Sequence, residues 1–390
     1  MSLRGLLSLT LVAALGSETG AVRPRQISES GAGAYEASLT PFENGMAMAW
    51  YDTRNARPEI YARLTDAAGA AIGPELRLAH SQRAAYEPDV AVADGNLVVA
   101  WYETAESSQS QAMLGSWTRE GAALWTTPLS PNELDARSPI VRVSGDQMFC
   151  AWLQASSEGE LALWARWFDR HGAPLDRPRR IAPAGRTTWN LNGAIDSRGR
   201  AWVAFDAVAG TRSEELFLAT IDRTSIDVQR VTTDDGNASK YPDIAFSGGR
   251  IALTWFDTRD GNEEVYLWSA ASDRVKSDDM KNIDSRARRV TDTKGESIGA
   301  YVAWNHNRIG LAWCDNTSGQ QEIYFEPFDA SGRPLSPPRR ITDTATESLI
   351  PAIRPSRNGF LLVWNEFTPG PDGAHDSRGR SEVYSAFVEP

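Results

Sequence analysis

A short apolar run that ends in an aromatic residue recurs along the chain, and polar stretches rich in Gly, Asn and Asp separate its copies. An acid usually follows within two positions, as in Met-Ala-Trp50-Tyr-Asp52 and Leu-Thr-Trp255-Phe-Asp257. The aromatic residues of the seven copies, at intervals of 51, 51, 53, 50, 58 and 51 residues, are Trp50, Trp101, Trp152, Phe205, Trp255, Trp313 and Trp364. A period of this length is typical of propellers and solenoids, whose units bury their apolar faces only against neighbouring units.

The fifth copy shows which elements the pattern predicts. Its apolar and β-branched runs, with turn residues such as Gly248-Gly249 between them, are Arg230-Val-Thr232, Pro242-Asp-Ile-Ala-Phe246, Ile251-Ala-Leu-Thr-Trp255 and Glu264-Val-Tyr-Leu-Trp268. Runs of this length bounded by Gly, Asn and Asp predict short strands joined by hairpins. Four antiparallel strands in each of seven units predict an all-β fold, a seven-bladed β-propeller around a central channel.

The two ends of the chain predict how the ring closes. The last unit ends with its third strand, 382–387, and lacks a fourth. Near the start of the chain, Arg25-Gln-Ile-Ser28 resembles the fourth strands of other units, such as Arg289-Val-Thr291 and Arg340-Ile-Thr342. We therefore expect the N-terminal strand to complete the last blade, which leaves no exposed sheet edge.

Most of the recurring residues are explained by structure rather than by catalysis. The aromatic residue of each copy is large and regularly spaced, which predicts packing between blades. Asp52, Asp257 and Asp315 can each accept hydrogen bonds from backbone N–H groups of the following loop. Arg54 precedes Glu59 by five residues, and we expect these two to pair across one hairpin. A catalytic acid is needed once, so repetition in most units favours a structural role.

Composition narrows the possible partners. Forty basic and 51 acidic side chains give a net charge of −11, which argues against nucleic acid or an anionic membrane surface as a partner. The two cysteines, Cys150 and Cys314, fall in units three and six, on opposite sides of a closed ring, and are expected to be buried and unpaired. The twelve-residue calcium loop is absent, and neither a metal nor a cofactor is expected.

The first 21 residues have the pattern of a secretory signal peptide. Arg4 precedes an apolar run, 5–16, which is followed by small residues up to Ala21, so cleavage after Gly16 or after Ala21 would both fit. The run is too short to span a bilayer. We therefore expect a secreted or periplasmic protein without membrane insertion, a monomer, whose propeller domain covers residues 22–390.

The repeat resembles those of exported bacterial β-propellers that are loosely grouped with the sialidase-like (BNR/Asp-box) superfamily. Three features carry this resemblance over residues 25–390: Trp-x-Asp-x-Arg-x-Gly-x-x-Glu-(Ile/Val)-Tyr, then Phe-Asp-x-x-Gly-x-x-Leu, then Arg-(Ile/Val)-Thr. It implies a propeller fold and a group that mixes glycoside hydrolases, lectin-like binders and proteins of unknown role. The turns here read Asp-x-x-Gly without the Thr-Trp of a true Asp-box, and the arginine motif of sialidases is absent. These departures argue against an active sialidase.

Ligands of propellers usually bind over the channel mouth, on the face that carries the loops entering the first strands and those joining the second and third strands. On that face the candidate ligand-binding residues are Tyr35, Glu36, Tyr86, Glu87, Arg137, Lys240, Tyr241, Tyr301 and, in the long loop 367–380, His375. Tyr-Glu pairs opposite cationic groups are chemistry that a glycosidase uses on an acidic sugar. Aromatic residues with mixed charges would equally suit a lectin or a peptide-binding site, or could simply border a solvent-filled pore.

Two functions follow from this face. The first hypothesis is a propeller that binds a glycan or a protein partner without catalysis, because no complete catalytic motif is present. The alternative is a carbohydrate-active enzyme, either a glycoside hydrolase or a polysaccharide lyase, that acts on an acidic glycan through Glu36 or Glu87. A lyase would need His, Tyr and Arg together, for which His80, Tyr86 and Arg137 are the candidates. The identity of the ligand and the presence of catalysis are left open by the sequence.

Overall fold

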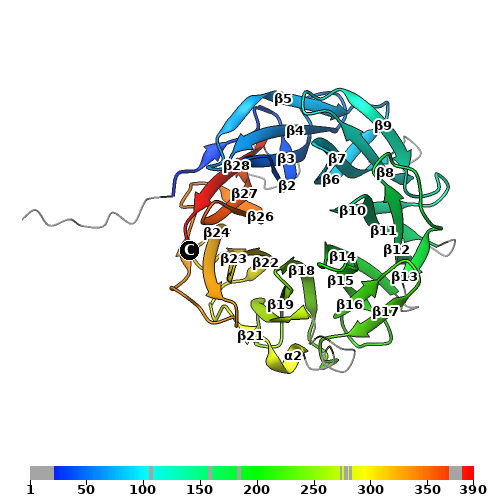
Figure 1. Cartoon of the computed structure of the whole chain (residues 1–390). Coiled ribbons are helices and arrows are strands. Elements are labelled where there is room, and N and C mark those ends of the chain that lie inside the picture. Colours follow the sequence, from blue (N-terminus) through cyan, green and yellow to red (C-terminus); the bar gives the residue numbers. More distant parts are fainter. Residues whose placement is uncertain are drawn as a thin grey trace, which may run out of the picture.

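The computed structural model describes residues 22–104, 109–156, 160–181, 186–272, 275, 280, 283–368 and 380–390, with the backbone alone for 186–189. The predicted signal peptide and His375 lie outside these ranges. The described residues form seven four-stranded antiparallel sheets arranged in a ring around a central channel (Figure 1). The predicted all-β, seven-bladed propeller is confirmed.

In each blade the first strand borders the channel and the last strand lies at the rim (Figure 1). Blade 1 consists of β2 (Ala34–Phe42), β3 (Gly45–Asp52), β4 (Glu59–Asp66) and β5 (Ala71–Ala79). Blade 2 consists of β6 (Ala84–Ala93), β7 (Asn96–Thr104), β8 (Ser110–Trp117) and β9 (Ala123–Pro128). Blade 3 consists of β10 (Ala136–Ser144), β11 (Gln147–Ala155), β12 (Leu161–Asp169) and β13 (Arg179–Ile181). Blade 4 consists of β14 (Arg186–Ile195), β15 (Ala201–Val208), β16 (Glu215–Ile221) and β17 (Ile226–Arg230).

The remaining blades follow the same plan, and the described part of blade 5 includes a short helix before its fourth strand. Blade 5 consists of β18 (Ser239–Ser247), β19 (Arg250–Asp257), β20 (Glu264–Ala271), the helix α2 (Ile283–Arg286) and β21 (Arg288–Arg289). Blade 6 consists of β22 (Ser297–Asn305), β23 (Arg308–Asp315), β24 (Glu322–Asp329) and β25 (Arg339–Arg340). Blade 7 consists of β26 (Glu347–Ser356), β27 (Gly359–Thr368), β28 (Arg380–Val388) and β1 (Arg25–Gln26).

The N-terminal strand completes the last blade, as expected. β1 pairs antiparallel with β28, so that Arg25 lies opposite Ser385, and the two strands lie side by side in Figure 1. Ile27, the next residue, is fully buried in the apolar cluster between blades 7 and 1. Ser28 accepts a hydrogen bond from the Val383 N–H at 2.8 Å and donates one to Glu382. The ring is therefore closed by backbone pairing, apolar packing and a buried hydrogen bond.

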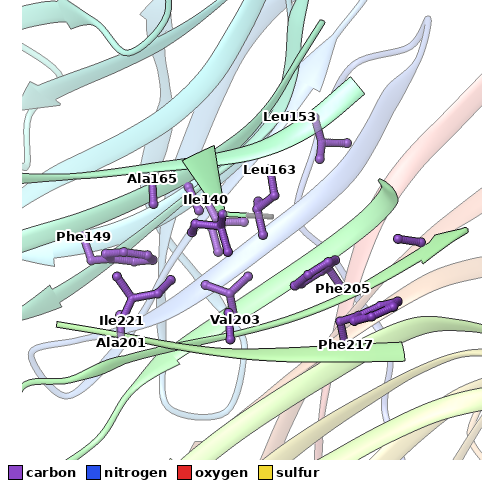
Figure 2. Close-up of a cluster of buried hydrophobic side chains, with 14 of the residues drawn as sticks. Ile140, Phe149, Leu153, Leu163, Ala165, Ala201, Val203, Phe205, Phe217 and Ile221 are labelled. Atoms are coloured by element: carbon purple, nitrogen blue, oxygen red, sulfur yellow. The ribbon is translucent and has the colours of Figure 1, made fainter. Parts of the chain in front are cut away.

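Apolar layers between neighbouring blades form the core. The seven aromatic residues of the repeat are at most 2% exposed, which confirms their predicted packing role. Trp152 of blade 3, for example, packs in one cluster with apolar residues of blade 2. Figure 2 shows the next interface, where Phe149 of blade 3 lies beside Ile221 of blade 4, in one cluster with Leu163 and Val203. Each blade thus buries its faces against its two neighbours, as the repeat pattern requires.

The acid after the aromatic residue has two roles in the blade. Asp52 accepts the indole N–H of Trp50 at 3.1 Å, which satisfies a buried donor. Its other oxygen accepts the backbone N–H of Arg54 at 2.9 Å, so the predicted loop cap is confirmed. The same arrangement is present at Asp257, which accepts the N–H groups of Trp255 and Arg259.

The predicted pairing of Arg54 with Glu59 is wrong. Arg54 folds back over Asp52 and also reaches Glu75 at 2.5 Å, whereas Glu59 binds Arg77 of the neighbouring strand β5. Asp52 lies opposite Glu59 in the ladder between β3 and β4. Asp52 and Glu59 are both buried, but Asp52 is nearer to Arg54 along the chain and Glu59 already has Arg77, so the Arg54 guanidinium stabilises Asp52.

Candidate functional site

A β-bulge at the channel end of each inner strand builds the site. The pairing of β2 with β3 shifts between Tyr35 and Ser38, and the other six blades shift at the corresponding place. Glu36 occupies the bulge in blade 1 with φ of 53°, and Glu87 occupies it in blade 2 with φ of 47°. A bulge re-aims its side chain, and positive φ costs a non-glycine residue about 1–3 kcal/mol.

The bulge does not itself require an acid. In the described blades beyond the first two, the same position holds Ser138, Tyr241, Gly299 and Ile350, all with positive φ. Residues as different as Gly and Ile fit this backbone, so the geometry cannot be the reason for two adjacent glutamates. The repeated acids at other positions have structural partners, whereas this pair calls for a different explanation.

The bulge residues line one cavity of about 460 Å³ at the mouth of the channel. Glu36 and Glu87 enter it from blades 1 and 2, Tyr241 from blade 5 and Tyr301 from blade 6. Four of the predicted site residues therefore share a single cavity, although they are far apart in the sequence.

Glu36 holds its proton unusually strongly. Its backbone N–H donates to Asn365 Oδ1 of blade 7 at 2.9 Å, and within the described residues its carboxyl group makes no hydrogen bond. Burial and the neighbouring charge of Glu87 raise the pKa of Glu36 from 4.5 to about 8. Its carboxyl group is therefore largely protonated at neutral pH and open to a ligand in the cavity.

Glu87 has a different environment, although burial raises its pKa as well. Ser138 of blade 3 donates its hydroxyl to Glu87 Oε2 at 2.7 Å, and the positive charge of Arg137 lies close enough to favour the ionised form. Because the two carboxyl groups interact, they titrate as a pair. Glu87, with its two supporting groups, loses the first proton, and its charge then holds the proton on Glu36.

A row of aromatic rings borders the two glutamates. From blade 7 through blade 1 to blade 2, with neighbouring centroids separated by 5.9, 5.2, 5.3 and 5.3 Å, it consists of Phe367, Tyr35, Tyr51, Tyr86 and Tyr102. Burial and the charges of Glu36 and Glu87 raise the pKa values of Tyr51 and Tyr102. Both hydroxyls therefore remain protonated and can donate hydrogen bonds.

Sequence reasoning identified Tyr35 and Tyr86 but missed Tyr51 and Tyr102. Each missed residue lies directly opposite an identified one in the first ladder of its blade. A signal was present, because a tyrosine follows the repeat tryptophan in units one and two alone, the same units that carry the glutamates.

The predicted cationic residues are held by local acids. Arg137 pairs with Asp135, and Lys240 pairs with Glu214 at 3.3 Å. The half-exposed ring of Tyr241 stacks on Phe256 with centroids 5.5 Å apart. His80 follows β5 near Glu59 at the outside of blade 1, away from the inner strands that carry Tyr86 and Arg137. The three residues proposed for a lyase are thus not brought together.

Within the part of the chain that the structure describes, no group of three or more His, Cys, Asp or Glu residues could hold a metal ion. In the same part, none of the helices is long and apolar enough to cross a membrane. Cys150 and Cys314 are buried and free, as expected.

The raised pKa of Glu36 predicts a pH-dependent cost to stability. Between pH 4.5 and 8 the folded protein binds this proton and the unfolded chain does not, so the free energy of unfolding falls as pH rises. The slope from one group is at most about 1.4 kcal/mol per pH unit. Glu36→Gln removes the group, so the variant is expected to gain stability relative to the wild type between pH 5 and pH 8.

Urea unfolding of both proteins at several pH values measures this difference. Glu120→Gln, at an exposed turn where the Glu120 side chain is 73% exposed, is the control and should track the wild type. A constant difference between Glu36→Gln and the wild type across this range would contradict the proton affinity assigned to Glu36.

Known proteins resemble this one in their fold. No protein-family model matches the sequence, and no curated protein matches it either. The structure is similar to the GH93 α-L-arabinofuranosidase of Fusarium graminearum in complex with arabinobiose, with a TM-score of 0.51 and 14% identity over 76% of this chain and 90% of that one. It is also similar to the polysaccharide lyase Uly1, with a TM-score of 0.55 and 10% identity over 90% of this chain and 89% of that one. The phage phi92 endosialidase gives a TM-score of 0.54 and 8% identity over 94% of this chain and 69% of its own.

At these identities the similarity concerns the fold. All three structures are β-propellers. The resemblance of this chain to sialidase-like propellers, expected from its repeats, is therefore confirmed at the level of architecture.

Proposed function

We propose that this protein is a carbohydrate-active enzyme, a glycoside hydrolase in which Glu36 is the general acid and Glu87 is the general base or nucleophile. The observation that carries the proposal is the pair itself. Two carboxyl groups on equivalent bulges of adjacent blades face one cavity, and their environments favour different protonation states. Perturbed carboxyl pairs of this kind are typical of functional sites.

The two protonation states match the two tasks of glycoside hydrolysis. One carboxylic acid must protonate the leaving oxygen, and one carboxylate must activate water or attack the sugar. Glu36 is protonated at neutral pH because of its burial and of the charge on Glu87. Glu87 is stabilised as a carboxylate by Ser138 and Arg137. When their environments give two titratable groups different pKa values, the group with the higher pKa can act as the acid and the other as the base.

The surroundings suit a sugar. The half-exposed ring of Tyr241 offers an apolar face in the cavity, and Tyr301, which lines the same cavity, offers a hydroxyl donor for sugar hydroxyls. The structural neighbours are named as an arabinofuranosidase, a polysaccharide lyase and an endosialidase, and each of these names describes an enzyme that acts on glycans. These points support the enzymatic alternative over the non-catalytic binder that we expected first. The glutamate pair favours hydrolysis over elimination.

Product analysis tests this proposal. The wild type is incubated with a panel of neutral and acidic polysaccharides, and new reducing ends and the ultraviolet absorbance of unsaturated ends are measured in parallel. Reducing ends without unsaturation, absent with Glu87→Gln and retained with Glu120→Gln, are the expected result. Unsaturated ends would assign a lyase instead, and binding of a glycan without any product would restore the non-catalytic hypothesis.

A further inference from the structure

The channel continues below the two glutamates into a second cavity of about 400 Å³. Arg142 of β10 and Arg354 of β26 line both this cavity and the upper one, so their side chains lie where the two cavities meet. A ligand that enters between Glu36 and Glu87 therefore meets these two guanidinium groups next along the channel.

Arg142 is fully engaged by the protein. Its Nη1 donates to Asp89 Oδ2 at 2.5 Å, its Nη2 to Asn192 Oδ1 at 2.6 Å, and its Nε to the Gly193 carbonyl oxygen at 2.5 Å. Asp89 also accepts the backbone N–H of Val141 at 2.7 Å. This guanidinium group is fixed in place and helps to join blades 2, 3 and 4.

Arg354 is not engaged in this way. Its Nη1 donates to the carbonyl oxygen of Ile353 at 2.8 Å, and no ion pair holds it among the described residues. The acid that acts on it most strongly, Asp243, accepts the backbone N–H of Val302 at 2.8 Å. The other N–H groups of Arg354 find no acceptor in the described part of the chain and are open to the channel.

A guanidinium group in a narrow channel with unused donors lacks the partner that its charge requires. It stays protonated in proteins, and removing it from bulk water costs several kcal/mol unless an anion compensates. Its planar fork matches the oxygens of a carboxylate or a sulfate. Burial, and after it the nearby positive charge of Arg142, lower the pKa of Arg354, because both disfavour its charged form. An anion bound between the two guanidinium groups would relieve their repulsion.

We infer that Arg354 binds an acidic substituent of the substrate, so that the glycan carries a carboxylate or a sulfate group. The bound glycan is a substrate only if the proposed hydrolase function is correct, so this inference rests on that function. The anion site itself can be tested independently of hydrolysis. Because Arg354 faces the same cavity as Glu36 and Glu87, the acidic group enters the channel while the sugar lies between the two glutamates.

Calorimetric titration at constant ionic strength tests the site with sodium glucuronate, glucose 6-sulfate, sodium sulfate and neutral glucose as probes. The wild type is expected to bind glucuronate or glucose 6-sulfate and to bind glucose about tenfold or more weakly, as expected for loss of a charge-assisted hydrogen bond. Arg354→Met should lose the binding of that acidic sugar by a similar factor. Arg333→Met, on an exposed turn where Arg333 is 76% exposed, is the matched control and should bind as the wild type does.

Several outcomes overturn the inference. Equal binding of the acidic sugar by the wild type and Arg354→Met, or no binding by the wild type, would remove the site. Binding of inorganic sulfate without binding of either glucuronate or glucose 6-sulfate would assign the site to a free inorganic anion. If Arg354→Met does not fold, Arg354→Gln serves in its place, because it keeps polarity and removes the charge. If anion binding depends on Arg354 but the protein cleaves no glycan, only the hydrolase proposal is refuted. If the protein cleaves neutral glycans and no acidic ones, only the acidic substrate is refuted.

Discussion

Glu36→Gln and Glu87→Gln are each expected to lower kcat by about 10²–10⁴-fold on a glycan that the wild type cleaves. The two variants should differ in their dependence on the leaving group. Glu36 protonates the leaving oxygen, so Glu36→Gln should recover activity on aryl glycosides whose phenols leave without protonation. Glu87 is needed for attack on the sugar, so Glu87→Gln should stay inactive on the same substrates. Steady-state kinetics on a polysaccharide and on an activated aryl glycoside measure both effects.

The pH profile provides a second readout of the same pair. The active form has Glu36 protonated and Glu87 ionised, so kcat/KM of the wild type should rise as Glu87 loses its proton and fall near pH 8 as Glu36 does. Glu36→Gln should lose the fall near pH 8. Ser138→Ala removes a hydrogen bond that favours ionised Glu87 and should move the rising limb to higher pH. Wild-type activity in both variants, with unchanged profiles, would exclude this pair from catalysis.

Ile27→Asp is expected to unfold the propeller at a much lower urea concentration than the wild type requires. Ile27 is fully buried between blades 7 and 1, and truncating such a side chain to alanine costs about 2–5 kcal/mol. Aspartate adds the cost of burying a charge without a partner. The substitution should also release the neighbouring Ser28, and leave Glu382 without the Ser28 hydroxyl that donates to it.

Gln26→Asp is the matched control for this prediction. Gln26 is the adjacent residue of the closing strand, and its side chain is exposed, so the same new charge should cost little beyond the Gln26 Nε2 hydrogen bond to the Ser28 carbonyl oxygen, about 0.5–1.5 kcal/mol. Urea denaturation followed by tryptophan fluorescence compares the two variants. Similar midpoints for Ile27→Asp and Gln26→Asp would mean that the N-terminal strand does not hold the ring closed.

Much of the architecture can be predicted from the sequence because the repeat encodes contacts at constant offsets. The interval between Trp50 and Trp101 sets one blade, and the apolar runs on either side set its strands and its packing against the next blade. The missing fourth strand at the C-terminus and the Arg25–Ser28 segment predicted the closure. The exception was the pairing of Arg54, because the sequence does not show that Arg77 of the next strand pairs with Glu59 and that Arg54 pairs with Asp52 and Glu75 instead.

By itself, the sequence determined the number of blades, their closure, the buried unpaired cysteines and the face on which Glu36 and Glu87 lie. The tertiary structure alone decided that these two carboxyl groups share one cavity, that Tyr51 and Tyr102 border them, and that Arg354 is left without an ion pair among the described residues. The physical reason is that local patterns specify strands and turns, whereas proton affinity and unused charge depend on burial and on distances across the closed channel. Those quantities are set by residues of different blades, such as Glu36 and Asn365, which are 329 residues apart in the chain.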